Sequence, residues 1–130
     1  MIMNLIDRIK EQEGFASLKP IDDEQIKEAE LALNLKFAED YKQLLREFGI
    51  FSIIGHELTG ICKSKRLNVV DVTSEEKTIN KNIPEGLYVV ELLNIDDVVI
   101  WQSADGKIYQ SEFNSVPVEI HKNLESYLFD

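Results

Sequence analysis

The hydrophobic period of the chain changes at Gly49, and this change constrains the fold more than any other feature of the sequence. Four apolar side chains before it recur at helical spacing, namely Tyr41, Leu44, Leu45 and Phe48. They form one apolar stripe along a helix, which Gly49 is well suited to end. Beyond Gly49 the period shifts towards two over residues 51–54 and 58–62, with Gly55 and His56 placed for a two-residue turn. A helix followed by a β-hairpin is therefore predicted.

Further helices are predicted before this point. Residues 5–14 have helical apolar spacing and end in glycine. Asp22, followed shortly by Gln25, resembles a capping box, so we expect a second helix over residues 22–34. Glu30 lies on the apolar side of that helix, where we expect its carboxylate to make a structural hydrogen bond.

The second half of the chain carries mostly strand signals. Residues 63–82 contain plausible helix starts at Asn68 and at Thr73, so we expect a loop and a short helix of either register. Strand-forming residues then fill a meander of antiparallel segments at residues 87–93, 98–102 and 107–113. After an extended or partly helical stretch at residues 118–120, residues 124–128 show the spacing of a short final helix.

This order of elements indicates an α+β domain, because helices gathered before a mostly antiparallel sheet do not form repeated βαβ units. We expect about five strands in one central sheet, with helices at the N-terminus and a short helix at the C-terminus. The length of 130 residues and the hydrophobic content of 44% suit one domain with its own core over residues 1–130.

The chain is strongly acidic. Its 14 Lys and Arg residues against 24 Asp and Glu residues give a net charge of −10. This charge repels the phosphates of nucleic acids and anionic lipid headgroups, so we expect neither a nucleic acid nor a membrane as a direct ligand. It attracts basic partners, although excess charge also serves to keep a cytosolic protein soluble.

A cytoplasmic location is predicted from the N-terminus and from cysteine use. Asp7 and Arg8 follow only a few apolar residues, so no secretory signal is recognisable, and no window is apolar enough to span a membrane. Cys62 is the only cysteine and cannot form an internal disulfide, which suits a reducing compartment. We interpret Cys62 as a small core residue at a strand end.

Few residues are of the types that catalysis or a cofactor needs. The six glycines form neither a P-loop nor a dinucleotide fingerprint, and one cysteine with two histidines is too few for a structural zinc site. His56 and His121 are the candidates for the base of a nucleophilic triad, and each is more typical of a surface histidine. We therefore expect no enzymatic activity, no cofactor and no metal.

Acidic residues near predicted loops are the candidate contacts with a protein partner, because they are accessible to a basic surface. They are Glu57, Asp96, Asp97 and Asp105. Asp96 and Asp97 also suit a turn for local reasons. Trp101, on a predicted strand, is a further candidate because tryptophan is enriched at binding hot spots, although a single tryptophan also suits the core.

Two stretches of the chain resemble the SUKH superfamily, the bacterial relatives of yeast cell-wall regulators. The first is IKEAELALNLKFAEDYKQLLREFG at residues 26–49, followed by a hairpin ending in ELTGI, and the second is YVVELLNIDDVVIWQSADGKIYQ at residues 88–110. The resemblance implies an α+β fold with a central antiparallel sheet. For most bacterial members it also implies an immunity protein that neutralises a cognate polymorphic toxin, often a nuclease.

Several functions are compatible with these observations. The first is an immunity protein that covers the active site or substrate channel of a basic nuclease toxin, which needs occlusion and no chemistry. The second is a non-catalytic regulatory scaffold domain that binds another cytosolic protein, as the eukaryotic relatives suggest. The third is a hydrolase that uses a pair of carboxylates, for which the sequence offers no positive signal. The net charge of −10 favours the first.

Overall fold

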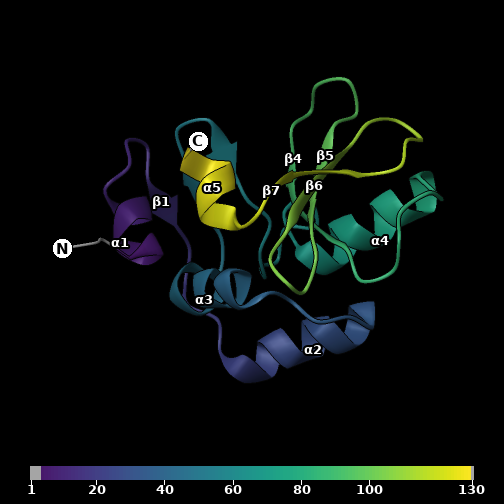
Figure 1. Cartoon of the computed structure of the whole chain (residues 1–130). Coiled ribbons are helices and arrows are strands. Elements are labelled where there is room, and N and C mark those ends of the chain that lie inside the picture. The colour runs from purple at the N-terminus through teal and green to yellow at the C-terminus, as the bar shows by residue number, and fades with distance from the viewer. Residues whose placement is uncertain (1–3, 130) are drawn as a thin grey trace.

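The computed structural model describes residues 4–129, which contain helices and strands in mixed order (Figure 1). The helices are α1 (Leu5–Lys10), α2 (Asp23–Leu33), α3 (Glu39–Phe48), α4 (Val69–Ile79) and α5 (Leu124–Phe129). The strands are β1 (Ala16–Ser17), β2 (Phe51–Ile53), β3 (His56–Glu57), β4 (Tyr88–Leu92), β5 (Val99–Gln102), β6 (Ile108–Ser111) and β7 (Val118–His121). Within these residues, no helix combines the length and the apolar character that crossing a membrane requires.

The predicted α+β class is confirmed, but the predicted single central sheet is wrong. The strands form two antiparallel sheets, one of three strands in the order β1-β2-β3 and one of four strands in the order β4-β5-β6-β7. Strand β1 has only two residues and pairs through Ala16 with Ser52, far along the chain. So short a strand shows no period in the sequence, which is why the division into two sheets was not predictable from pattern.

The larger sheet contains the predicted meander. Strands β4, β5 and β6 lie inside the three segments expected for it, and β7 adds a fourth strand at the edge. The stretch at residues 118–120, predicted as extended or partly helical, is therefore strand. Helix α5 follows it as expected.

The predicted capping box at the start of α2 is confirmed. Asp22 Oδ1 accepts a hydrogen bond from the Gln25 N–H at 2.8 Å, and the Gln25 side chain accepts one from the Asp22 N–H at 3.4 Å, which completes the capping box. Glu30 is buried, and its Oε2 accepts a hydrogen bond from the Phe37 N–H at 2.8 Å, as expected. Helix α3 ends at the predicted glycine, Gly49, and the four residues of its apolar stripe are all buried.

The hairpin after α3 differs from its prediction. The turn consists of Ile54 and Gly55, while His56 already pairs with Ile53 in β3. Strand β3 then ends after two residues, so the predicted strand at residues 58–62 is absent. This stretch leaves the sheet because its backbone bonds to the segment before α4: the Gly60 N–H donates to Leu67 O at 2.9 Å.

Helix α4 resolves the two registers left open by the sequence. It begins after Asn68, whose side chain accepts a hydrogen bond from the Val70 N–H at 2.9 Å, and not at Thr73. Its 11 residues make it longer than the short helix expected. Thr73 is buried instead, and its Oγ1 accepts a hydrogen bond from the Val89 N–H at 2.9 Å, which ties the helix to β4.

The two faces of the larger sheet pack against different elements (Figure 1). One face packs against α4 in a cluster of Val72, Leu87, Val89, Val99 and Trp101. The other face joins the main core with α2, α3 and α5, through Tyr88, Val90, Ile100 and Ile108. Neighbouring residues on one strand therefore enter different clusters, as the two-residue period of a strand requires.

Candidate functional site

A pocket of about 270 Å³ opens where the C-terminal half of α4 meets one end of the larger sheet. Its acidic lining residues are Glu76, Asp97 and Glu112. Ile79 and Phe113 also line it, and their side chains are 48% and 63% exposed. The pocket therefore combines carboxylates with exposed apolar surface.

The meander explains why these residues meet. Strands β5 and β6 are antiparallel, and Val99 pairs with Ser111. Asp97 precedes the start of β5 and Glu112 follows the end of β6, so both lie at the same end of the sheet. Helix α4 covers one face of this sheet and contributes Glu76 to the pocket from that face.

Two asparagines fix the end of α4 to the turn after β6. Asn80 Nδ2 donates a hydrogen bond to Ser115 O at 2.9 Å, and Asn82 Nδ2 donates one to Asn114 O at 2.7 Å. The two walls of the pocket are thus joined by hydrogen bonds, which makes the pocket a preformed feature of the fold.

Trp101 lies beneath this pocket and not on the surface. Its side chain is 0% exposed, and its Nε1 donates a hydrogen bond to Ser111 Oγ at 2.9 Å. The hypothesis that Trp101 is a surface contact is therefore corrected: the residue belongs to the cluster between α4 and the sheet. From the sequence, the side chain of Trp101 could have pointed to either face of its strand. It is buried because α4 packs on the face to which it points.

The pocket carries negative charge that the fold does not neutralise. Burial raises the pKa of Glu76, and the neighbouring carboxylates of Glu75 and Asp97 raise it further. The ion pairs found among residues 4–129 involve none of the three lining carboxylates. A cationic group placed in the pocket would relieve this repulsion, because opposite charge favours the ionised carboxylate.

The β4–β5 turn holds both aspartates that were predicted as partner contacts. Asp96 and Asp97 are exposed and have positive φ angles of 52° and 56°. Aspartate tolerates this left-handed region better than most residues, so the local interpretation as turn formers accounts for their type. Asp97 lines the pocket as well, so its turn role does not exclude a contact with a partner.

Asp105 and Glu57, the other predicted contacts, lie apart from the pocket. Asp105 follows β5 at the opposite end of the sheet, where hydrogen bonds from the Ser103 hydroxyl and the Lys107 N–H lower the pKa of its carboxyl. Glu57 belongs to the smaller sheet and forms an ion pair with Arg66 at 2.9 Å. Of the four predicted acidic contacts, only Asp97 therefore lines the pocket.

Sequence reasoning missed Glu76, Glu112 and Phe113 as members of the site. The register of the meander could have placed Glu112 beside Asp97, because an antiparallel pair brings the start of one strand to the end of the next. Nothing in the sequence could have placed Glu76 there, since its position depends on which face of the sheet α4 covers.

The histidines have structural partners. Nδ1 of His56 lies 2.9 Å from Glu91 Oε1, and the rings of His56 and Tyr127 form a T-shaped pair with centroids 5.2 Å apart. Nδ1 of His121 lies 2.9 Å from Ser126 Oγ. Glu91 is buried and also accepts hydrogen bonds from the Glu57 N–H and from the Tyr127 hydroxyl, so this network joins β3, β4 and α5.

Cys62 differs from its prediction as a core residue at a strand end. It lies in a loop, is partly exposed, and its Sγ contacts Ser64 O at 3.5 Å. The prediction failed because the strand expected at residues 58–62 does not form. Across residues 4–129, no group of three or more His, Cys, Asp or Glu side chains is arranged to hold a metal ion.

The fold and the pocket define a small α+β domain with two antiparallel sheets and a concave acidic surface at one end of the larger sheet. The chain matches the family model SUKH_5, described as SMI1-KNR4 cell-wall, over residues 2–128. It belongs to this SUKH family, as the resemblance of its sequence implied. A search of curated proteins finds no match.

Proposed function

We propose that the chain is a cytoplasmic immunity protein that binds a cognate toxin and blocks its active site or substrate channel. Membership of the SUKH family is consistent with an immunity role or a regulatory role. The net charge of −10 favours a basic target, and nuclease toxins present basic surfaces because they bind phosphates. In this proposal the chain performs no reaction itself.

The acidic pocket beside α4 carries the proposal. A lysine or arginine side chain from the toxin would place its charge near Glu76, Asp97 and Glu112. Its aliphatic stem would lie against the exposed side chains of Ile79 and Phe113, as long cationic side chains pack on apolar surface. A charge pair formed in a partly buried pocket is screened by solvent less than one on an open surface.

Co-expression with toxin domains encoded beside this chain tests the proposal, with cell survival as the readout. The pocket variant is Asp97→Asn/Glu112→Lys: both residues are exposed, and asparagine tolerates the positive φ of position 97, so the fold should survive. The matched control is Glu13→Gln/Glu28→Lys, which changes the net charge equally on exposed residues outside the pocket. We expect the pocket variant to lose at least about tenfold in affinity, while the control stays near the parent protein.

Two outcomes would contradict this function. If a folded parent chain rescues cells from none of the neighbouring toxins, the immunity role is wrong. If the pocket and control variants lose the same affinity, binding depends on overall charge and not on the pocket.

A regulatory scaffold domain is the second candidate, because the family description refers to the cell wall. Under this alternative the chain captures a cytosolic host protein and no toxin. Capture that depends on Asp97 and Glu112, in the absence of any rescue from toxins, would favour it.

A further inference from the structure

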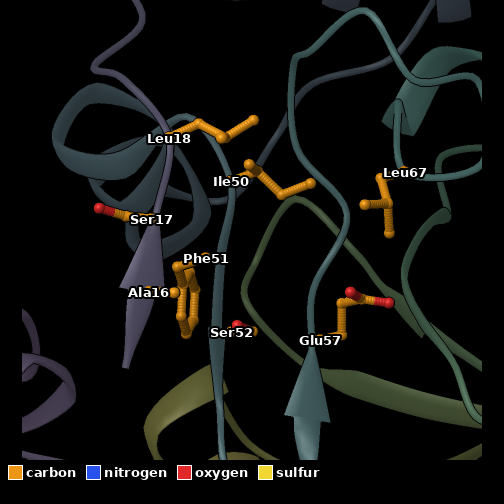
Figure 2. A pocket seen from close by; sticks show the side chains of 8 residues that line it. All are labelled: Ala16, Ser17, Leu18, Ile50, Phe51, Ser52, Glu57 and Leu67. Atoms are coloured by element: carbon orange, nitrogen blue, oxygen red, sulfur yellow. The ribbon is translucent and has the colours of Figure 1, made fainter. Parts of the chain in front are cut away.

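A second hollow lies on the smaller sheet and shares no lining residue with the acidic pocket. It consists of two connected parts of about 730 and 190 Å³, both of which are lined by Ser17, Leu18 and Leu67. Figure 2 shows the narrower part, with Leu18 on one wall, Leu67 on the other and Ile50 between them. We call this hollow the Leu18 groove.

We propose that the Leu18 groove docks an extended peptide segment in which a bulky apolar side chain stands next to an Asp or Glu. This surface is separate from the acidic pocket, so the proposal does not rest on the immunity role. The wider part of the groove has the size of a ligand site, since such sites commonly measure roughly 300–1,000 Å³.

The groove is built into the backbone of the fold. The Leu18 N–H donates to Ile50 O at 3.1 Å, and the Ile61 N–H donates to Gly49 O at 3.1 Å. The three chain segments approach so closely that a Cβ on Gly60 would lie 1.9 Å from Gly49 O. The floor is therefore fixed, while the segment at residues 16–19, which begins with β1, and the loop at residues 61–67 rise on either side.

The walls are apolar and accessible. Leu18 is 65% exposed and shares the groove with other apolar side chains. Ile21, Ile61 and Leu67 line the same hollow. A large apolar side chain from a partner would cover this surface, and burial of apolar area stabilises a complex by about 25 cal/mol per Å² before the costs of association.

The rim of the wider part of the groove is basic in an otherwise acidic chain. Lys19 lies on one wall and Lys63 on the other, and Lys65 belongs to the same loop as Lys63, whereas Arg66 is paired with Glu57 of the narrower part. Among residues 4–129, neither Lys19 nor Lys63 forms an ion pair. The acidic remainder of the surface repels acidic peptides. The lysines on both walls therefore favour a peptide here that carries a carboxylate beside its apolar side chain.

The shape favours an extended segment. The two connected parts run from Gln25 at the start of α2 to Glu57 in β3, between two chain segments that do not close over them. Figure 2 shows the narrower part of this course, with Ala16, Ser17 and Leu18 along one side. A peptide in extended form covers about 3.3 Å per residue and can present alternate side chains to such a trench.

Selection of a displayed library of random octapeptides on the full-length chain tests the proposal. We expect enriched peptides with Leu, Ile or Phe within two positions of Asp or Glu. A fluorescein-labelled enriched peptide is then titrated by fluorescence polarisation. The variant Lys19→Glu/Lys63→Glu should weaken its binding at least about tenfold, and Leu18→Ser should weaken it several-fold.

The control variant Lys81→Glu/Lys122→Glu makes the same change of charge on exposed residues outside the groove and should bind as the parent chain does. Circular dichroism checks that each variant is folded. In addition, labelled amides of Leu18, Lys19 and Ile61 should shift in NMR spectra when the peptide is added.

Three results would overturn the proposal. The first is that no motif is enriched, or that the peptides bind Lys19→Glu/Lys63→Glu unchanged. The second is that only basic peptides are enriched and that Asp97→Asn/Glu112→Lys abolishes their binding, which would place the site at the acidic pocket. The third is that decanoate binds the groove while no peptide does, which would assign it to small amphiphiles.

Discussion

Replacement of Asp40 by alanine should loosen the contact between α3, the larger sheet and the C-terminal helix. Asp40 Oδ1 accepts a hydrogen bond from Gln102 Nε2 at 2.9 Å, and Oδ2 accepts one from the Leu124 N–H at 3.0 Å. Oδ1 also accepts the Tyr41 N–H at 2.8 Å in the first turn of its own helix. One carboxylate therefore joins segments that are remote in sequence.

The magnitude follows from which donors would lose their partner. Gln102 and Leu124 are both 0% exposed, so water cannot readily replace the carboxylate. A buried donor left unsatisfied costs about 1–3 kcal/mol, but Gln102 Nε2 keeps Gly106 O as an acceptor at 3.1 Å and should lose less. Loss of an acid near a helix N-terminus adds about 0.3–1 kcal/mol. We expect a total loss of about 3 kcal/mol in the free energy of unfolding.

Urea unfolding, followed by tryptophan fluorescence and far-UV circular dichroism, measures this loss. The matched control is Glu39→Ala in the same helical turn, whose side chain is 81% exposed and pairs with Lys42 at 3.0 Å. An exposed pair of this kind contributes at most about 1 kcal/mol. Asp40→Asn retains one acceptor oxygen and should fall between the two. If Asp40→Ala loses no more than Glu39→Ala, the reasoning is refuted.

Two further predictions concern the residues around the acidic pocket. Trp101→Phe removes the hydrogen bond to Ser111 and leaves a space in the cluster under α4, so the free energy of unfolding should fall by about 2–3 kcal/mol. Far-UV circular dichroism must follow this variant, since Trp101 is the only tryptophan, and an unchanged unfolding curve would contradict its structural role. Burial and neighbouring carboxylates raise the pKa of Glu76 above its ordinary value of 4.5, so the folded state favours the protonated form. The stability that this preference contributes is present below pH 4.5 and is lost as the pH rises through the folded pKa. Glu76→Gln should therefore be more stable than the parent at pH 7, and this advantage should disappear in urea unfolding below pH 4.5; an equal advantage at both pH values would contradict the argument.

The sequence by itself determined the elements that depend on neighbouring residues. The capping box of α2, the apolar stripe of α3 and the end of that helix at Gly49 all follow from side chains within one or two turns of each other. The meander was also predictable, because each of its strands has its own strand-forming residues and short turns. The buried hydrogen bond of Glu30 was expected for the same reason, since its helical face is set by the local period.

The assembly of the sites depended on contacts that no local pattern contains. Trp101 could have faced either side of its strand until α4 covered one of them, and Asp97 met Glu76 only through the same packing. The pairing of β1 with β2 divided the strands into two sheets and formed one wall of the Leu18 groove. Period and capping act over a few residues and can be read along the chain. The relative placement of elements depends on burial summed over the whole core, so only the tertiary structure decided which acids share a pocket.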